Sequence, residues 1–479
     1  MRGVTYPDET RFAFRSGVTC LTTPAGGVLL NPPRSEKLTR LSASQLDALK
    51  TLNLGPATIS ELARGSAEEI GALIGQLAAG GWLTISVRDE AKELYAVVPH
   101  GLPPARPEPL PSSSALSKFA VLHRDSEGFV LEHPMSWCDV RIHDARLLPL
   151  LDGCESTDVP SVVTAQFVED LRWSGMLVTD EEHGFETLSW SAPDLWFHRR
   201  STLGERNVTW DHFGPTKWAK GRYPQPPARA TDNSGEPIKL PVPDLADKQA
   251  HDPTLTAVLE ERVSTRTFDD AHPITLEQLA ELLYRAARTR KTLPVGEGEE
   301  LLSRPYPSGG GIYELELYPV VRNVTGLDAG MYHYDSFEHA LRLVAAADSK
   351  AVSQLMKPAA ATLTGGAEPQ ILIVMAARAG RIMWTYEQIG YSAILKDVGV
   401  LMQTIYLAAT AMGLGACAQG FSNTAAFVAA TGVEHVAAYC DRLMAGSIRC
   451  FIEGRMRPRR TWENSTRLTS CISPRTGSI

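Results

Sequence analysis

The second half of the chain carries two helical patterns of apolar residues. In the longer one, Ile394, Val398, Leu401 and Ile405 are spaced three to four positions apart, so they share one broad face of a helix that begins near Tyr391. A shorter amphipathic pattern follows Thr275, which is a favourable N-cap residue. These patterns predict two helices that each bury one face.

Two short apolar runs in the same half, 315–321 and 371–375, indicate buried strands because they are rich in Val, Ile, Leu and Tyr. Helical and strand patterns are mixed from about Thr254 onward. The chain from 254 to 479 is therefore expected to form one α+β domain.

The first 220 residues contain two segments with the same order of patterns: a short strand, helices, a glycine turn and a further strand. The first strands lie at 27–30 and 128–131, and Ser42 or Ser44 is the expected N-cap of the first helix. This order is typical of a winged helix. The helix at 68–76 starts with two acidic residues and has no lysine or arginine, so it suits peptide docking better than DNA binding. A repeat kept only for packing or dimer contacts is an equal alternative.

Two proline-rich stretches, 99–111 and about 223–253, separate these parts. Proline lacks an amide donor and fixes its own backbone, so we expect spacers there and not strands or helices. The expected domains are a first winged-helix-like repeat at 1–98, a second repeat with a helical linker segment at 114–220, and the α+β domain at 254–479.

The composition, with 43% hydrophobic and 21% charged residues, is that of a chain that fills two or three cores and stays in solution. A net charge of -8 argues against a nucleic-acid surface. The seven cysteines are scattered and form no C-x-x-C pair, which favours reduced thiols over disulfides or a metal site. The N-terminus has no signal-peptide core, and charged and polar residues interrupt the long helix. We therefore expect a cytoplasmic protein without a membrane partner.

One candidate anion site is the triplet Arg262, Ser264 and Arg266. In an extended segment the three side chains point to the same side and offer two guanidinium forks and a hydroxyl, which suits a phosphate group. Taken alone the triplet is weak, since arginines at this spacing are common on solvated strands.

A second candidate is the glycine-rich turn of Pro307, Ser308, Gly309, Gly310 and Gly311. Three glycines remove side chains where a flat ring has to lie against backbone. A turn that only precedes a strand is the alternative.

With the stretch 386–399 and the turn at 413–415, these motifs resemble the flavin site of the nitroreductase superfamily. More narrowly, the chain resembles the SagB/ThcOx-type FMN-dependent azoline dehydrogenases, strongly from about Arg262 to Gly420. The resemblance implies an α+β fold in which a nitroreductase-like FMN domain follows two tandem winged-helix-like repeats. The cofactor-binding residues that it implies are Arg262, Ser264, Arg266, Pro307, Ser308, Gly309, Gly310, Gln403, Gly413, Gly415 and Gly420.

The resemblance also implies an activity and partners. Such enzymes oxidise azoline rings to thiazoles or oxazoles in ribosomally made peptides, and they form homodimers with FMN at the subunit interface. A precursor peptide with a leader, and a cyclodehydratase, are the implied partners. In one repeat, the leader would add a strand to an exposed sheet edge.

The catalytic pair departs from the family. Relatives carry a Lys-Tyr pair, and the corresponding residues here are Thr385 and Tyr386. A threonine hydroxyl is no base near neutral pH, and tyrosine, with a reference pKa near ~10, needs activation. Three alternatives follow. Tyr386 is the base, alone or through water; another residue such as Glu387 is the base; or the reaction differs from that of the relatives.

Two other functions stay open for that reason. The chain could reduce dehydroamino acids or another modified peptide, which reverses the direction of the hydride, or it could be a weakly catalytic scaffold for a cyclodehydratase. The arginine-rich end, 446–479, is expected to be a solvated tail or an extension that wraps a dimer partner.

Overall fold

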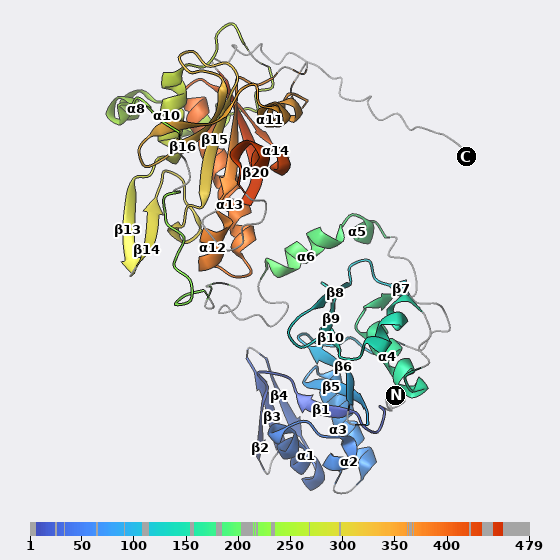
Figure 1. The fold of residues 1–479 in the computed structure, drawn as a ribbon. Coiled ribbons are helices and arrows are strands. Elements are labelled where there is room, and N and C mark those ends of the chain that lie inside the picture. The colour runs from blue at the N-terminus through green and yellow to red at the C-terminus, as the bar shows by residue number, and fades with distance from the viewer. Residues whose placement is uncertain are drawn as a thin grey trace, which may run out of the picture. The chain divides into compact units, whose positions relative to one another are not determined.

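The protein divides into two compact units, Met1–Phe213 (unit 1) and Gly214–Ile479 (unit 2), and each is described by itself (Figure 1). The structure, a computed structural model, describes residues 6–23, 26–32, 34–63, 66–90, 92–107, 115–153, 158–178, 184–202, 214, 216, 219–230, 235–267, 269–296, 298–361, 363, 366, 368–420 and 423–433, and the backbone of 444–453.

Unit 1 begins with a strand, a three-stranded sheet, three helices and a hairpin: β1 (Arg11–Phe14), β2 (Thr19–Thr23), β3 (Gly26–Asn31), β4 (Arg34–Thr39), α1 (Ala43–Leu54), α2 (Ile59–Leu62), α3 (Ala67–Ala79), β5 (Leu83–Asp89) and β6 (Lys92–Pro99). It continues with β7 (Ala115–Leu116), β8 (Val121–Arg124), β9 (Phe129–Glu132), β10 (Cys138–Ile142), the 3-10 helix η1 (Ala145–Asp152), α4 (Ser161–Trp173), β11 (Leu177–Val178), α5 (Phe185–Leu188) and α6 (Ala192–Arg200).

Local sequence explains the start of α1. Ser42 is its N-cap and forms a capping box with Gln45, in which each side chain accepts from the other residue's amide. Pro149 lies inside η1, where its missing amide and its ring disfavour a regular α-helix.

The two segments expected to be repeats share one sheet and one hydrophobic core. The six-stranded sheet has the order β1-β5-β6-β10-β9-β8, and β6 of the first segment pairs with β10 of the second. Apolar residues from both, such as Leu73, Val97, Val140 and Phe167, belong to the same buried cluster. Within the described residues, Cys20 and Cys138 of this unit are buried free thiols.

Unit 2 begins with β12 (Pro237–Lys239), α8 (Leu245–His251), α9 (Leu255–Glu261), α10 (Leu276–Ala287), β13 (Lys291–Gly296), β14 (Glu299–Ser303) and the 3-10 turn η2 (Gly309–Gly311). It continues with β15 (Leu315–Val321), β16 (Gly330–Asp335), β17 (Ala340–Ala346), α11 (Lys350–Ala360), β18 (Ile371–Ala377), α12 (Ala379–Thr385), α13 (Gly390–Ala411), β19 (Gly415–Gln419), α14 (Thr424–Thr431) and β20 (Met444–Glu453).

Helices cover both faces of the seven-stranded sheet of unit 2, which has the order β12-β17-β16-β15-β18-β20-β19. Alternate residues of β15 explain this layering: Leu315 and Leu317 belong to a cluster with α10 and α13, whereas Tyr318 and Val320 belong to one with α11 and α14. Thr275 caps α10 as expected, and unit 2 is the predicted mixture of helix and strand.

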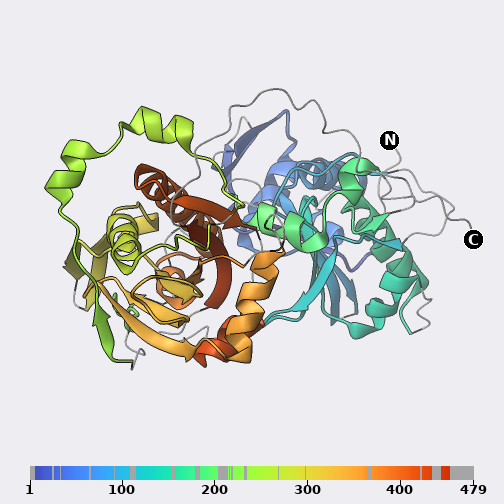
Figure 2. The ribbon, with the colours of Figure 1, turned by 90° about the horizontal axis from the view of Figure 1, so that it is seen from above.

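The helix α13 is the long apolar helix that the sequence predicts. By length and composition alone it could also cross a membrane, but half of that stretch is buried inside the unit. In this position it serves as the core helix of unit 2. The helices α8 and α9, in light green in Figure 2, lie along the outer edge of the unit and bury only Val258.

Two expectations for unit 2 were wrong. The second proline-rich stretch is not only a spacer, because β12 pairs with β17 and α8 follows it; an edge strand tolerates proline because its outer amides need no partner. The chain from 446 to 453 is not a tail, because β20 lies between β18 and β19. The rest of the arginine-rich end lies outside the described residues.

Candidate functional site

The segment with Arg262, Ser264 and Arg266 lies beside strand β19. Ser264 forms a parallel bridge with Ala416, and the amide of Thr265 donates to the Ala416 carbonyl oxygen over 2.9 Å. The segment is extended there, as the alternating triplet requires.

Tyr406 of α13 joins this segment to the core. Its hydroxyl lies 3.0 Å from Ser264 Oγ and accepts from the Ala418 amide at 2.6 Å, and the Arg262 guanidinium carbon is 5.3 Å from its ring centre. Within the described part of the chain, neither Arg262 nor Arg266 forms an ion pair with a carboxylate. We call Arg262, Ser264, Arg266 and Tyr406 the arginine cluster.

Four further predicted cofactor residues lie on α13 and β19 or directly after them. A side chain at Gly415 would come within 2.9 Å of Thr265, so glycine allows the arginine segment to approach the strand. Gly413 ends α13 with φ 70°, which explains glycine there without a ligand. Gln403 is exposed one helical turn before Tyr406, and Gly420 is exposed just after β19.

The glycine turn is held to α13 by Asp397. Ser308 Oγ donates to Asp397 Oδ2 at 2.7 Å, and the amide of Gly309 donates to both carboxylate oxygens, at 3.0 and 3.2 Å. Ser308 Oγ also accepts from the Tyr313 amide at 3.0 Å. The turn is therefore fixed from two sides, while Pro307 and Gly310 stay exposed.

Tyr386 lies directly over this turn. A side chain at Gly310 would come within 2.5 Å of the Tyr386 hydroxyl, and φ at Gly310 is 61°, a region that favours glycine. Thr385 points elsewhere: its hydroxyl contacts the Arg381 carbonyl oxygen at 3.5 Å, one turn back in α12. The structure thus brings Tyr386 to the turn and leaves the Thr385 hydroxyl on its own helix.

Burial changes the acidity of two groups here. Burial, and then the nearby charge of Asp397, raises the pKa of Tyr386, so its hydroxyl keeps its proton at neutral pH. The same two causes raise the pKa of Glu314 to about 7. Asp397, Glu314 and Tyr406 are not among the site residues predicted from the sequence; a charged residue inside the apolar pattern of α13 was the available signal for Asp397.

The arginine cluster and the glycine turn contact opposite edges of α13. Asp397, which holds the turn, and Tyr406, which contacts Ser264, are nine residues apart, or about two and a half helical turns. Their side chains therefore leave the helix in opposite directions.

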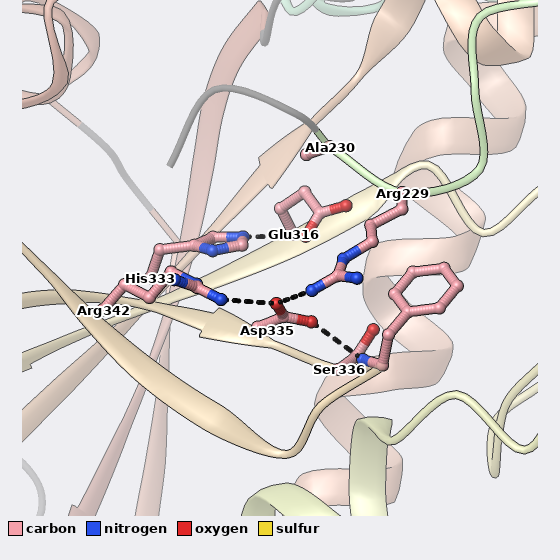
Figure 3. Close-up of a pocket in the computed structure, with 8 residues that line it drawn as sticks. Arg229, Ala230, Glu316, His333, Asp335, Ser336 and Arg342 are labelled. Carbon is pink, nitrogen blue, oxygen red and sulfur yellow. Dashed lines mark hydrogen bonds and ion pairs between the residues drawn. The ribbon is translucent and has the colours of Figure 1, made fainter. Parts of the chain in front are cut away.

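A separate pocket of about 320 Å³ lies between β15, β16 and β17 and the segment near Arg229 (Figure 3). Its floor is the buried pair of Glu316 and His333, joined by a 3.0 Å hydrogen bond. Asp335 forms ion pairs with Arg229 at 2.6 Å and with Arg342 at 3.6 Å. None of the predicted site residues lines it.

Comparison with known proteins agrees with this architecture. Residues 259–444 match the family model described as Nitroreductase family, and residues 114–207 match the model described as Cyanobactin oxidase ThcOx. A protein of Methanocaldococcus jannaschii assigned as a nitroreductase is 30% identical over 186 residues, which are 39% of this chain and 85% of that protein.

Two solved structures are also similar. A protein of Ralstonia eutropha assigned as a nitroreductase is 26% identical, with 52% of this chain and 99% of that chain covered and a TM-score of 0.36. A chain of the Escherichia coli microcin synthetase McbBCD complex with truncated pro-MccB17 is 17% identical, with 46% and 85% covered and a TM-score of 0.32.

The chain therefore belongs to the nitroreductase family and is an oxidoreductase. The ThcOx match ahead of the nitroreductase domain makes it a member of the SagB/ThcOx type, as its motifs had indicated.

Proposed function

We propose that this protein is an FMN-dependent dehydrogenase that oxidises azoline rings to azoles in a ribosomally made peptide. The observation that carries the proposal is the Tyr386 hydroxyl held directly over the glycine turn, where a Cβ on Gly310 would come within 2.5 Å of it. The arginine cluster supplies the second part of such a site. Family membership and the ThcOx match support the same reaction.

The residues present fit FMN. Arg262 and Arg266 have no carboxylate partner within the described residues, and with Ser264 they form a donor set that suits a dianionic phosphate. Ser308, Gly309 and the exposed Gly310 offer backbone without bulky side chains, which suits the flavin ring. Bound FMN would supply a hydride acceptor.

This chain's own residues would orient the flavin ring and accept the proton that the substrate releases. Tyr386 presents a protonated hydroxyl, so it acts as a base only if another group takes its proton as it accepts one from the substrate. Thr385 contributes no base, because its hydroxyl is directed to the Arg381 carbonyl oxygen.

Restoring the family lysine tests whether position 385 faces the substrate. We expect Thr385→Lys to raise the turnover of an azoline peptide at least about tenfold, because a positioned base contributes roughly 10²–10⁴-fold. Thr385→Met is the control of similar length without an amine, and it should not raise turnover. An unchanged rate for the lysine variant would mean that the position or the reaction is assigned wrongly.

We also propose a homodimer with a flavin shared between two copies. Since the two parts of the site contact opposite edges of α13, one flavin would take the arginine cluster of one copy and the glycine turn of the other. Exposed apolar residues support a covered surface nearby: Leu255 and Leu259 on α9, which are 66% and 50% exposed, and Leu395 on α13.

Mixed dimers distinguish a shared site from one built within a single chain. We expect an Arg262→Ala/Arg266→Ala chain and a Tyr386→Phe chain to be inactive alone but to recover about a quarter of wild-type turnover when refolded together. Random pairing makes half of the dimers mixed, and each mixed dimer has one intact site. No recovery in a preparation shown to contain mixed dimers would place both parts in the same chain.

Unit 1 is proposed to recognise the precursor peptide. The two expected winged-helix-like repeats would present β2, β4 and β8, which are edges of their sheets, and all four residues of β8 are exposed. An extended leader could pair with such an edge. A cyclodehydratase partner and a cytoplasmic location complete the proposal.

The test is an absorbance spectrum of the purified protein before and after anaerobic addition of an azoline peptide, with and without its leader. Bound flavin that bleaches supports the dehydrogenase, and slower bleaching without the leader supports recognition by unit 1. Flavin that stays oxidised favours the second candidate, a reductase of dehydroamino acids, for which the protonated Tyr386 is a suitable donor. Protein without flavin favours the scaffold.

A further inference from the structure

Two buried carboxyl groups share one serine beneath the glycine turn. Asp397 accepts the hydroxyl proton of Ser308 at 2.7 Å, and Glu314 Oε2 lies 3.4 Å from the same Ser308 oxygen. Asp397 is 6% exposed and Glu314 is fully buried. Since one hydroxyl has one proton, it can serve only one of the two carboxyl groups at a time.

The Glu314 carboxyl has fewer hydrogen-bond partners than that of Asp397 within the described residues. Its Oε1 atom is buried without a hydrogen-bond partner within the described residues. The charged and titratable groups that face it are Asp397 from α13 and Arg304 and Tyr306 from the segment before the turn. A buried carboxyl beside a second carboxyl is costly to ionise, so its proton affinity is high.

Asp397 of this pair also lies close to Tyr386. A side chain built on Gly309 would be 3.8 Å from both Asp397 Oδ2 and the Tyr386 ring. The Asp397 charge acts on the Tyr386 hydroxyl, as its effect on the Tyr386 pKa indicates. Proton transfer between neighbouring groups can run through one water.

We propose that Glu314 is the proton acceptor that serves Tyr386, acting through Asp397 and Ser308, and that it replaces the lysine absent at position 385. Glu314 touches neither substrate nor cofactor, so its role is to receive and hold a proton behind the turn. The inference rests on the proposed function, because it concerns the proton that ring oxidation releases.

Oxidation of the azoline ring removes one hydride and one proton. One ring C–H bond breaks and its electron pair leaves with the hydrogen as hydride, for which the flavin of the proposed function is the oxidant. The neighbouring ring C–H bond gives its hydrogen as a proton to Tyr386, and its electron pair forms the new ring double bond. Tyr386 passes its own proton to Asp397, Asp397 passes one to Ser308, and Ser308 passes its hydroxyl proton to Glu314.

A charged residue also lies near Glu314. Arg304 lies near both Glu314 and Glu316, and its charge favours the ionised form of each carboxyl. Glu316 forms the floor of the pocket in Figure 3, together with His333. Glu314 therefore shares a charged neighbour with a residue that lines this pocket.

Glu314→Gln in the full-length holoenzyme tests the proposal, because it keeps the shape and removes the titration. In the wild type, kcat/KM should rise with pH and level off above about 7, since the acceptor has to be ionised. In the variant, turnover should fall at least about tenfold and this pH step should vanish, with flavin content unchanged.

An infrared titration gives a readout that does not need turnover. A protonated carboxyl that ionises near pH 7 should be present in the wild type, absent in Glu314→Gln and retained in the matched control Glu316→Gln. If the pH step and the infrared signal both persist in Glu314→Gln, the proposal is overturned.

Failure of the proposed function looks different. The wild-type protein could instead reduce its substrate at a rate that falls as pH rises through 7. If Glu314→Gln removes this pH dependence, Glu314 is supported as the proton-exchanging group and the dehydrogenase direction is overturned. If Glu314→Gln removes the infrared signal but changes the rate of neither oxidation nor reduction, the role of Glu314 in proton transfer is overturned.

Discussion

Loss of flavin is the expected result of replacing both Arg262 and Arg266 by alanine. Each arginine would bring a charge-assisted hydrogen bond to the phosphate worth about 1.5–3 kcal/mol, so losing two weakens binding roughly 10²–10⁴-fold. At that affinity, FMN would not stay bound through purification. Flavin content is measured from the visible absorbance relative to protein.

The fold should survive this double substitution. Arg266 is exposed and Arg262 only half-buried, and within the described residues neither is paired with a carboxylate, so the apoprotein should unfold at the same temperature as wild-type apoprotein. Lys350→Ala/Lys357→Ala is the matched control, because it removes two exposed positive charges on α11, on the other face of the sheet. Normal flavin content in the arginine variant would remove the phosphate assignment.

Turnover should fall roughly 10²–10⁴-fold in Tyr386→Phe, the range expected when a positioned acid–base group is removed. The phenylalanine ring can still cover Gly310, because only the hydroxyl is lost, so flavin binding and the glycine turn should be unaffected. Steady-state turnover of an azoline peptide and flavin content are measured on the same preparation.

Tyr391→Phe controls for the loss of any tyrosine hydroxyl near α13, since Tyr391 is 44% exposed and lies five residues further along the chain. It should keep nearly all of the activity. Wild-type turnover in Tyr386→Phe would exclude Tyr386 from proton transfer and move attention to Glu387, whose amide donates to the Gly214 carbonyl oxygen.

Local sequence was enough to predict most elements. The capping residues Ser42 and Thr275, the apolar spacing of α13 and the apolar runs of β15 and β18 all act between near neighbours along the chain. Such patterns predict where a helix begins and which face it buries. They cannot predict that 446–453 is an inner strand, because a strand acquires its place from partners such as β18, far away in sequence.

What the sequence alone determined is the kind of protein: an α+β nitroreductase-family chain of SagB/ThcOx type, indicated by the motifs at 262–266 and 307–311. Only the tertiary structure decided what surrounds those motifs. It joined Ser264 to Tyr406 over 142 residues and Ser308 to Asp397 over 89, and it placed Glu314 behind the turn. The physical reason is that burial and pKa depend on neighbours in space, which packing brings together and local patterns do not specify.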